Sequence, residues 1–159
     1  MTRIVNDTKI ETVSIVYQPP KILLGMKKVR FGKGKYNGFG GGVEEWETIE
    51  QSAIRETYEE SGIKMINPVE MGKILFEFDS EEIDHLVYFL KATKYEGKAK
   101  ESDEMKPEWF HENNIPYDKM WPNDKYWLPL LLQGKKFKGN FKFNLENKIK
   151  DYELFEELV

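Results

Sequence analysis

Cysteine is absent from the sequence, and histidine is scarce, with two residues among 159. The absence of cysteine excludes disulfide bonds, thiolate metal ligands and cysteine nucleophiles, and it is compatible with a reducing compartment. Two histidines alone offer too few ligands for a typical zinc site. His85 lies in an apolar stretch and His111 follows two aromatic residues. We expect both to be structural or surface residues.

Long hydrophobic runs are also absent. The N-terminal segment MTRIVNDTKIE lacks the apolar core of a signal peptide, and no later segment approaches the roughly 18 apolar residues of a membrane-spanning helix. We therefore expect a soluble, cytoplasmic protein with no membrane partner. With 40% hydrophobic residues, 14% aromatic residues and no repeat, residues 1–159 are expected to form one domain, as a monomer.

The charge of the chain is weak overall but unevenly distributed. A net charge of −4 argues against a nucleic acid polymer as partner, since such proteins usually carry a basic domain. Residues 12–43 contain six basic and no acidic side chains, whereas residues 44–60 contain seven glutamates and one arginine. Two solvated faces are the plainer interpretation of these runs. The alternative is that an anion and a cation bind where the two stretches meet.

Apolar patterns and turn signals predict strands and two helices. The expected strands cover 12–18, 21–27, 73–79, 85–93, 137–144 and 148–158. A helix over about 48–61 begins with a capping box formed by Thr48 and Gln51 and ends at Gly62. A second helix over 124–133 contains Pro129, which should limit or kink it. This order of elements indicates an α+β fold with a mixed sheet.

The first of these helices carries an unusual group of acidic residues. Glu56, Glu59 and Glu60 are three and four residues apart, so they share one face, where their like charges repel. Oxygen ligands on a rigid helix suit Mg2+ or Mn2+, although such a face can also be plain solvated surface. The apolar side, expected to be buried, consists of Ile49, Ala53, Ile54 and Tyr58.

The spacing of these residues resembles a known motif. The pattern Gly41, Glu47, Arg55-Glu56, Glu59-Glu60, Gly62-Ile63 is similar to the Nudix box of the MutT-like pyrophosphohydrolases, with Thr57 replacing the usual apolar residue. The resemblance implies a mixed sheet sandwiched between helices, with the box forming a loop-helix-loop that holds divalent metal. It also implies hydrolysis of a nucleoside diphosphate linked to a further group, with Arg55 orienting Glu59.

The similarity extends beyond the box through LLGMKK, NGFGGG, ESDEM, MWPNDKYW and FKFN. These segments resemble the Nudix subfamily that hydrolyses oxidised purine nucleoside triphosphates of the 8-oxo-dGTP type. That subfamily sanitises the nucleotide pool in a Mg2+-dependent reaction that gives monophosphate and pyrophosphate. The alternatives are another nucleoside diphosphate derivative, such as ADP-ribose, a dinucleoside polyphosphate or a normal dNTP, and a Nudix module that binds nucleotide without turnover.

The resemblance also implies roles for individual residues. The implied catalytic residues are Arg55, Glu56, Glu59, Glu60 and Glu104. The implied metal ligands are the Gly40 carbonyl, Glu56, Glu59, Glu60 and Glu104. The implied nucleotide contacts are Thr12, Lys27, Asn37, the backbone of Phe39, Gly40, Gly41 and Gly42, and the side chains of Trp121, Asn123 and Asp124.

Several of these residues have plainer alternatives. Asn37 could form a turn, Trp121 could belong to the core, and Glu104 could be a solvated loop residue. Phe76 and Phe78 alternate along a strand and are expected in the core or in a pocket wall.

Asn123 is a departure from the subfamily pattern. Mammalian members carry two adjacent aspartates where this chain has Asn123-Asp124. Because an amide cannot share a proton with a neighbouring carboxylate, we expect a narrower range of oxidised purines.

Overall fold

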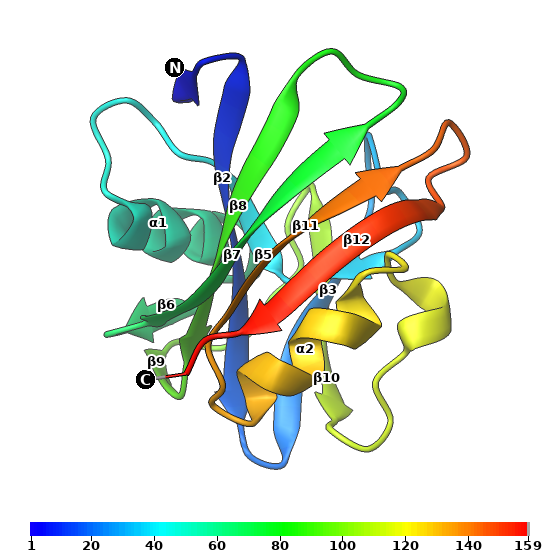
Figure 1. Ribbon diagram of the computed structural model, residues 1–159. Helices are drawn as coiled ribbons and strands as arrows, with labels where there is room; N and C mark the ends of the chain where they lie inside the picture. Colours follow the sequence, from blue (N-terminus) through cyan, green and yellow to red (C-terminus); the bar gives the residue numbers. More distant parts are fainter. Residues whose placement is uncertain (159) are drawn as a thin grey trace.

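A ten-stranded mixed sheet forms the centre of the computed structural model, which describes residues 1–158 (Figure 1). Its strands are β1 (Ile4–Val5), β2 (Thr8–Gln18), β3 (Lys21–Lys27), β4 (Tyr36–Asn37), β5 (Phe39–Gly42), β7 (Val69–Phe78), β8 (Asp84–Ala92), β10 (Met105–His111), β11 (Phe137–Phe143) and β12 (Ile149–Glu156). The main path runs β10-β3-β2-β8-β7-β11-β12. Two neighbouring pairs, β2 with β8 and β7 with β11, are parallel, which makes the sheet mixed as expected.

The helix α1 (Ile49–Ser61) has the boundaries that its sequence predicts. The Thr48 hydroxyl accepts a hydrogen bond from the Gln51 backbone N–H at 3.1 Å, and the Gln51 side chain accepts one from the Thr48 N–H at 2.9 Å. Gly62 ends the helix in the left-handed conformation, with φ of +78°. The predicted capping box and glycine stop are therefore confirmed.

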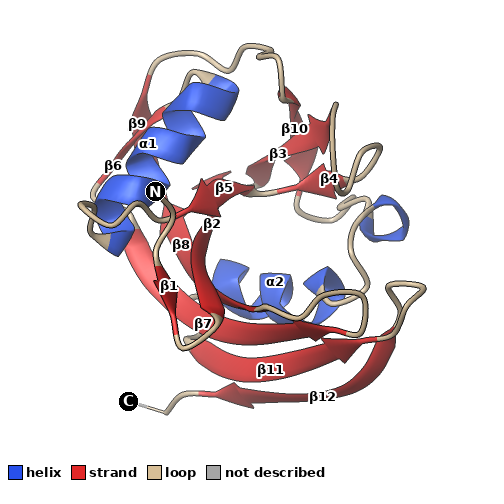
Figure 2. Cartoon of the chain, turned by 90° about the horizontal axis from the view of Figure 1, so that it is seen from above, coloured by secondary structure: helices blue, strands red, loops and turns tan. Residues whose placement is uncertain are grey.

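The second helix, α2 (Asp124–Leu132), is also confirmed, and it ends three residues after Pro129. A short 3-10 helix, η1 (Tyr117–Lys119), precedes it. Seen from above, the strands curve around α2, while α1 lies outside the curve (Figure 2). The two helices thus lie on opposite sides of the sheet.

Alternating residues of the strands supply two buried clusters, one on each face of the sheet. Ile15 packs with Trp127 and Leu128 of α2, whereas the next residue, Val16, packs with Ala53 of α1. This alternation is the ordinary period of a β-strand. The α2 side holds the larger cluster, which is rich in phenylalanine.

The buried face of α1 differs in part from the face that the sequence predicts. Tyr58 was expected inside but is 56% exposed, while Thr57 and Glu60 are buried. Ala53, Thr57 and Glu60 follow the helical spacing of four and three residues, so they share the face that is turned toward the sheet. Thr57, which replaces the usual apolar residue of the box, is fully buried, and its hydroxyl has no hydrogen-bond partner within the described residues.

The sequence also missed several strands. The run FGGG forms β5, although glycine is rare in strands. β10 contains Pro107, which an edge strand tolerates. β6 (Lys64–Ile66) and β9 (Lys94–Glu96) form a separate antiparallel pair that is too short to show a pattern.

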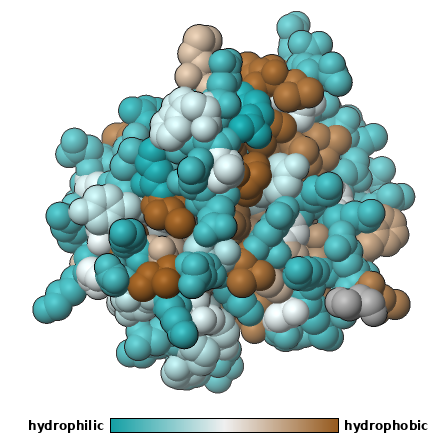
Figure 3. All heavy atoms as spheres, turned by 90° about the vertical axis from the view of Figure 1, so that its left-hand side faces the viewer, coloured by the Kyte–Doolittle hydropathy of each residue, from teal (hydrophilic) through white to brown (hydrophobic). Residues whose placement is uncertain are grey.

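The surface on the α1 side is mainly hydrophilic, with apolar side chains in separate patches (Figure 3). Within residues 1–158, neither helix is long and apolar enough to cross a membrane.

Candidate active site

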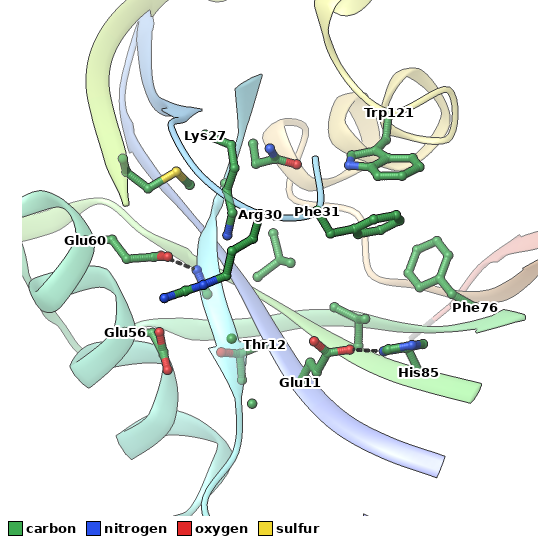
Figure 4. Close-up of a pocket in the computed structure, with 18 of the residues that line it drawn as sticks. Glu11, Thr12, Lys27, Arg30, Phe31, Glu56, Glu60, Phe76, His85 and Trp121 are labelled. Carbon is green, nitrogen blue, oxygen red and sulfur yellow. Dashed lines mark hydrogen bonds and ion pairs between the residues drawn. The ribbon is translucent and has the colours of Figure 1, made fainter. Parts of the chain in front are cut away.

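A cavity of about 850 Å3 lies between α1, the central strands and the start of α2. Carboxylates of α1 lie at one end, and aromatic side chains lie at the other (Figure 4). The basic stretch 12–43 and the acidic stretch 44–60 both contribute to its wall. The two stretches therefore meet at one cavity, which is the arrangement expected if an anion and a cation bind where they meet.

The carboxylate end is built by packing α1 against the glycine-rich strand β5. Glu60 is only 3% exposed, and its Oε1 accepts a hydrogen bond from the Gly40 N–H at 2.8 Å. A Cβ atom added to Gly41 would lie 2.8 Å from the Glu56 carboxylate. The glycines therefore let the backbone approach the acidic face more closely than other residues would allow.

Arg55 supports the carboxylate end of the cavity through ion pairs with nearby glutamates. Its guanidinium donates to Glu47 at 2.6 and 2.8 Å and to Glu56 at 2.8 Å, whereas Glu59 lies 3.4 Å away. The sequence predicts that Arg55 orients Glu59. In the structure this contact is weak, because the guanidinium is hydrogen-bonded mainly to Glu47 and Glu56. Hydrogen bonding to Arg55 lowers the pKa of the buried Glu47 carboxyl.

Burial makes the acidic face electrostatically unfavourable. Desolvation, together with the negative charges of Glu56 and Glu104, raises the pKa of Glu60 to about 8, against the lowering effects of the Gly40 N–H and Lys27. Desolvation also raises the pKa of Glu56, against the opposing effect of Arg55. A neighbouring cation would lower both pKa values and favour the ionised carboxylates.

A divalent metal fits this donor set. Within residues 1–158 no three acidic or histidine side chains are already gathered as a metal cluster. The carboxylates of Glu56, Glu59, Glu60 and Glu104 nevertheless line one cavity, and they are the hard oxygen donors that Mg2+ and Mn2+ prefer.

Glu104 occupies the opposite rim of the carboxylate end. It lies in the loop before β10, and its Oε1 accepts a hydrogen bond from Arg30 at 2.8 Å. It lines the cavity, which distinguishes it from an ordinary solvated loop residue. Lys27, at the end of β3, lines the same region, and its positive charge lowers the pKa of Glu60 in part.

Aromatic side chains enclose the other end. The rings of Phe31 and Trp121 are 5.1 Å apart, and Phe78 lies 6.2 Å from Phe31 and 6.3 Å from Trp121. Lys35 extends over the Trp121 ring at 5.4 Å. Phe76 is 8% exposed and lines the cavity, which confirms its expected place in the pocket wall.

Polar groups are placed beside these rings. Asn123 and Asp124 are 4% and 7% exposed at the start of α2, and the Trp127 indole donates to Asp124 Oδ1 at 3.1 Å. Burial raises the pKa of Asp124 to about 7, so this carboxyl can carry a proton near neutrality. Nearer the carboxylate end, Thr12 pairs with Gly41 of β5, and its buried hydroxyl has no hydrogen-bond partner within the described residues.

Most of the residues singled out in the sequence therefore face one cavity. The lining includes Thr12, Lys27, Asn37, Gly40, Gly41, Gly42, Glu56, Glu59, Glu60, Glu104, Trp121, Asn123 and Asp124. Asn37 lies in β4 rather than in a simple turn, and its amide donates to the Lys35 carbonyl at 3.1 Å. The side chain of Phe39, by contrast, is fully buried in the core, and Arg55 lies behind the cavity wall.

Other lining residues were missed in the sequence. Arg30 and Phe31 extend from the β3–β4 loop over the cavity. His85 was expected to be a structural or surface residue but contributes to the wall, together with Glu11 and Glu81. Nothing local in the sequence indicates this, because the parallel pairing of β2 with β8 brings Glu11 and His85 together.

The comparisons with known proteins agree with this geometry. The NUDIX domain family model matches residues 8–131. The chain is 48% identical to the oxidized purine nucleoside triphosphate hydrolase of Danio rerio and 46% identical to that of Mus musculus, each over 149 residues that cover 94% of this chain and 96% of the relative. The crystal structure of a MutT protein from Bacillus halodurans has a TM-score of 0.81 at 29% identity, covering 91% of this chain and 96% of that one. The family match spans most of the chain, including the glutamates beside the cavity, and the chain belongs to the Nudix hydrolase family.

Proposed function

We propose that this protein hydrolyses oxidised purine nucleoside triphosphates of the 8-oxo-dGTP type to monophosphate and pyrophosphate, using Mg2+ or alternatively Mn2+. One observation carries the proposal: a single cavity joins an acidic face at one end to a group of aromatic rings and buried polar groups at the other. A nucleotide has the matching polarity, with a polyphosphate at one end and a flat base at the other. The relatives at 46% and 48% identity carry the name of this activity.

The carboxylate end would bind the polyphosphate through metal. The ligands we assign are Glu56, Glu59, Glu60, Glu104 and the Gly40 carbonyl. When bound, a divalent cation neutralises part of the polyphosphate charge and favours attack of water on phosphorus. A carboxylate of this face, Glu59 or Glu60, accepts a proton from that water. Lys27 contacts the phosphates from the opposite wall, and Arg55 holds Glu56 in place.

The aromatic end would bind the base. Trp121 stacks against it, Thr12 and Asn37 offer hydrogen bonds, and the backbone from Phe39 to Gly42 borders the nucleotide. Asn123 presents a fixed amide donor and a fixed carbonyl acceptor. Asp124 is a donor when protonated and an acceptor when ionised, and its raised pKa makes both forms accessible near neutral pH.

The test is product analysis with purified protein against a panel of nucleotides, with Mg2+, with Mn2+ and with chelator. The panel contains 8-oxo-dGTP, 2-hydroxy-dATP, normal dNTPs, ADP-ribose and a dinucleoside polyphosphate. We expect the oxidised triphosphates to be cleaved with the highest kcat/KM and to release pyrophosphate. Preference for another member of the panel would reassign the substrate, and binding without turnover would identify a nucleotide-binding module.

A further inference from the structure

The floor of the cavity carries a charged network that the proposed chemistry does not use. Because β2 and β8 are parallel neighbours with Lys9 opposite His85, their alternate residues share one face of the sheet. Lys9, Glu11 and Val13 of β2 and His85, Val87 and Phe89 of β8 all line the cavity. The inner part of this floor is apolar, and the outer part is charged.

His85 joins two carboxylates within this floor. Its Nδ1 lies 2.5 Å from Glu11 Oε1, and its Nε2 lies 2.9 Å from Glu81 Oε2. An ionised carboxylate can only accept a hydrogen bond, so contacts with both Glu11 and Glu81 favour the protonated imidazole, in which both ring nitrogens donate. The hydrogen bond with Glu11 raises the pKa of His85, which agrees with this geometry. The ring of Phe78 packs against the imidazole at 5.5 Å and 88° and restricts its movement.

His85 therefore holds the Glu11 carboxylate in place, but only one of its two oxygens makes a hydrogen bond within the described residues. Its Oε2 lies 3.8 Å from Lys9 Nζ, which is too long for a hydrogen bond, so this oxygen can still accept one. A lone carboxylate would repel an anionic substrate. Here Lys9 and His85 balance Glu11 and Glu81, so the network as a whole carries no net charge when His85 is protonated. Such an acceptor can face the cavity without opposing the binding of phosphate.

The position of Glu11 indicates which part of a ligand it meets. Figure 4 places Glu11 between Thr12 and His85, on the aromatic side of Glu56 and Glu60. If the polyphosphate lies at Glu56 and Glu60, as proposed above, Glu11 faces the nucleoside. An 8-oxoguanine nucleotide offers as hydrogen-bond donors the ring N–H groups and the amino group of the base and the hydroxyl of the sugar. The amino group and the sugar hydroxyl project from the edges of the nucleoside, where a carboxylate on the cavity floor can reach them.

We propose that Glu11 is a specificity-determining residue that accepts a hydrogen bond from the base amino group or the sugar hydroxyl of the substrate, and that His85 positions its carboxylate. This inference rests on the proposed function, because it uses the orientation of the nucleotide in the cavity. It identifies the ligand as a nucleoside with an amino group on the base or a hydroxyl on the sugar next to the aromatic end of the cavity.

The experiment measures binding of the product-like ligand 8-oxo-dGMP to the Mg2+-loaded protein by calorimetry. Two analogues each lack one donor: the inosine form lacks the base amino group, and the 2′,3′-dideoxy form lacks the sugar hydroxyl. We expect one analogue to bind wild-type protein about 10- to 100-fold more weakly, the range for a hydrogen bond to a charged group. The analogue that loses affinity identifies the donor.

The variant Glu11→Gln completes the cycle. It should weaken 8-oxo-dGMP by a similar factor, and the sensitive analogue should then lose nothing further. Glu82→Gln, an exposed neighbour outside the cavity, is the matched control and should leave Kd unchanged. For His85→Gln we expect a higher KM at unchanged kcat, because a positioning residue on the floor affects binding rather than the reacting phosphorus.

The outcomes separate this inference from the proposed function. Hydrolysis of 8-oxo-dGTP with both analogues bound as tightly as 8-oxo-dGMP would overturn the role of Glu11 and leave the function standing. The expected loss of affinity without any turnover would support the role of Glu11 and overturn the function. No binding of 8-oxo-dGMP would overturn both. The analogue arms use wild-type protein, so they decide the question even if Glu11→Gln does not fold.

Discussion

The carboxyl group of Glu60 is placed where folding alone would not favour it. It is almost fully buried, it lies near other acidic groups, and its one hydrogen-bond donor within residues 1–158 is the Gly40 N–H. Burying a carboxyl in this way costs stability whenever the group is ionised. A position of this kind is typical of functional sites, where charge is arranged for a ligand rather than for the fold.

Glu60→Gln should stabilise the metal-free protein in a pH-dependent way. The folded pKa of about 8 exceeds the usual 4.5, so between these values the folded state binds a proton that the unfolded state has released. Wild-type stability therefore falls as pH rises through this window and levels off above it. The Tm difference between variant and wild type, measured with chelator, should grow from about pH 5 to pH 8 by a few degrees. A difference that is constant with pH would contradict the raised pKa.

Asn123 should restrict the range of bases that are accepted. Only Asp124 can change its hydrogen-bonding character with protonation, since Asn123 is an amide. We expect natural protein to prefer 8-oxo-dGTP over 2-hydroxy-dATP in kcat/KM, and Asn123→Asp to lower that preference. If both substrates are handled equally well and the substitution leaves their ratio unchanged, proton sharing does not govern this pocket.

An ion pair between Glu47 and Arg55, here called the brace, links the helix α1 to the preceding loop. Glu47 is 3% exposed, and Arg55 donates to both of its carboxylate oxygens. The same guanidinium reaches the Gly42 carbonyl at 3.3 Å and Glu56 at 2.8 Å. Glu47 thus orients Arg55, and Arg55 orients a carboxylate of the site.

Glu47→Gln should destabilise the protein by about 2–3 kcal/mol, because it leaves a half-buried guanidinium with a weaker partner. Urea unfolding measures this change, and Glu45→Gln, an exposed neighbour, should change stability by less than about 0.5 kcal/mol. We also expect kcat to fall, since Glu56 loses support. Equal stability of the two variants would show that the brace does not hold the helix.

The elements that could be predicted from the sequence are those with local signals. Thr48, Gln51 and Gly62 mark the ends of α1 within the chain itself. β5 was missed because its glycines carry no strand propensity, and it forms by pairing with β2. The Glu11–His85 and Arg30–Glu104 contacts join residues 74 positions apart, and only the strand register brings them together. Contacts between residues so far apart produce no periodic pattern in the sequence, so they could not be predicted from it.

The molecule as a whole separates its charges across the cavity. The basic residues before the box and the acidic residues of α1 lie on facing walls, with Lys27 inside the cavity and Lys33 outside its lining. Opposed charge on two walls would guide a metal-bound phosphate into the space between them. The aromatic cluster around α2 then closes the far end.

This arrangement predicts different salt sensitivity at three lysines. Lys27→Ala should raise KM at any ionic strength, because Lys27 is expected to contact the phosphates directly. Lys33→Ala and Lys35→Ala should raise KM less, and their effects should fade as salt screens charge over about 10 Å at 0.1 M. Steady-state kinetics over a salt series measures the difference. Equal and fully salt-sensitive losses at all three positions would rule out a direct contact by Lys27.

Hydrolysis of 8-oxo-dGTP by wild-type protein and by Glu59→Gln and Glu60→Gln, each with Mg2+ and with chelator, tests the central claim most directly. The amide removes the charge and basicity that the acidic face provides, but it keeps the shape of the side chain. We predict pyrophosphate release that requires divalent cation and that falls by at least about 100-fold in kcat in each folded variant. Near-normal turnover in both variants, or undiminished turnover with chelator, would contradict the assignment of this face as the catalytic centre.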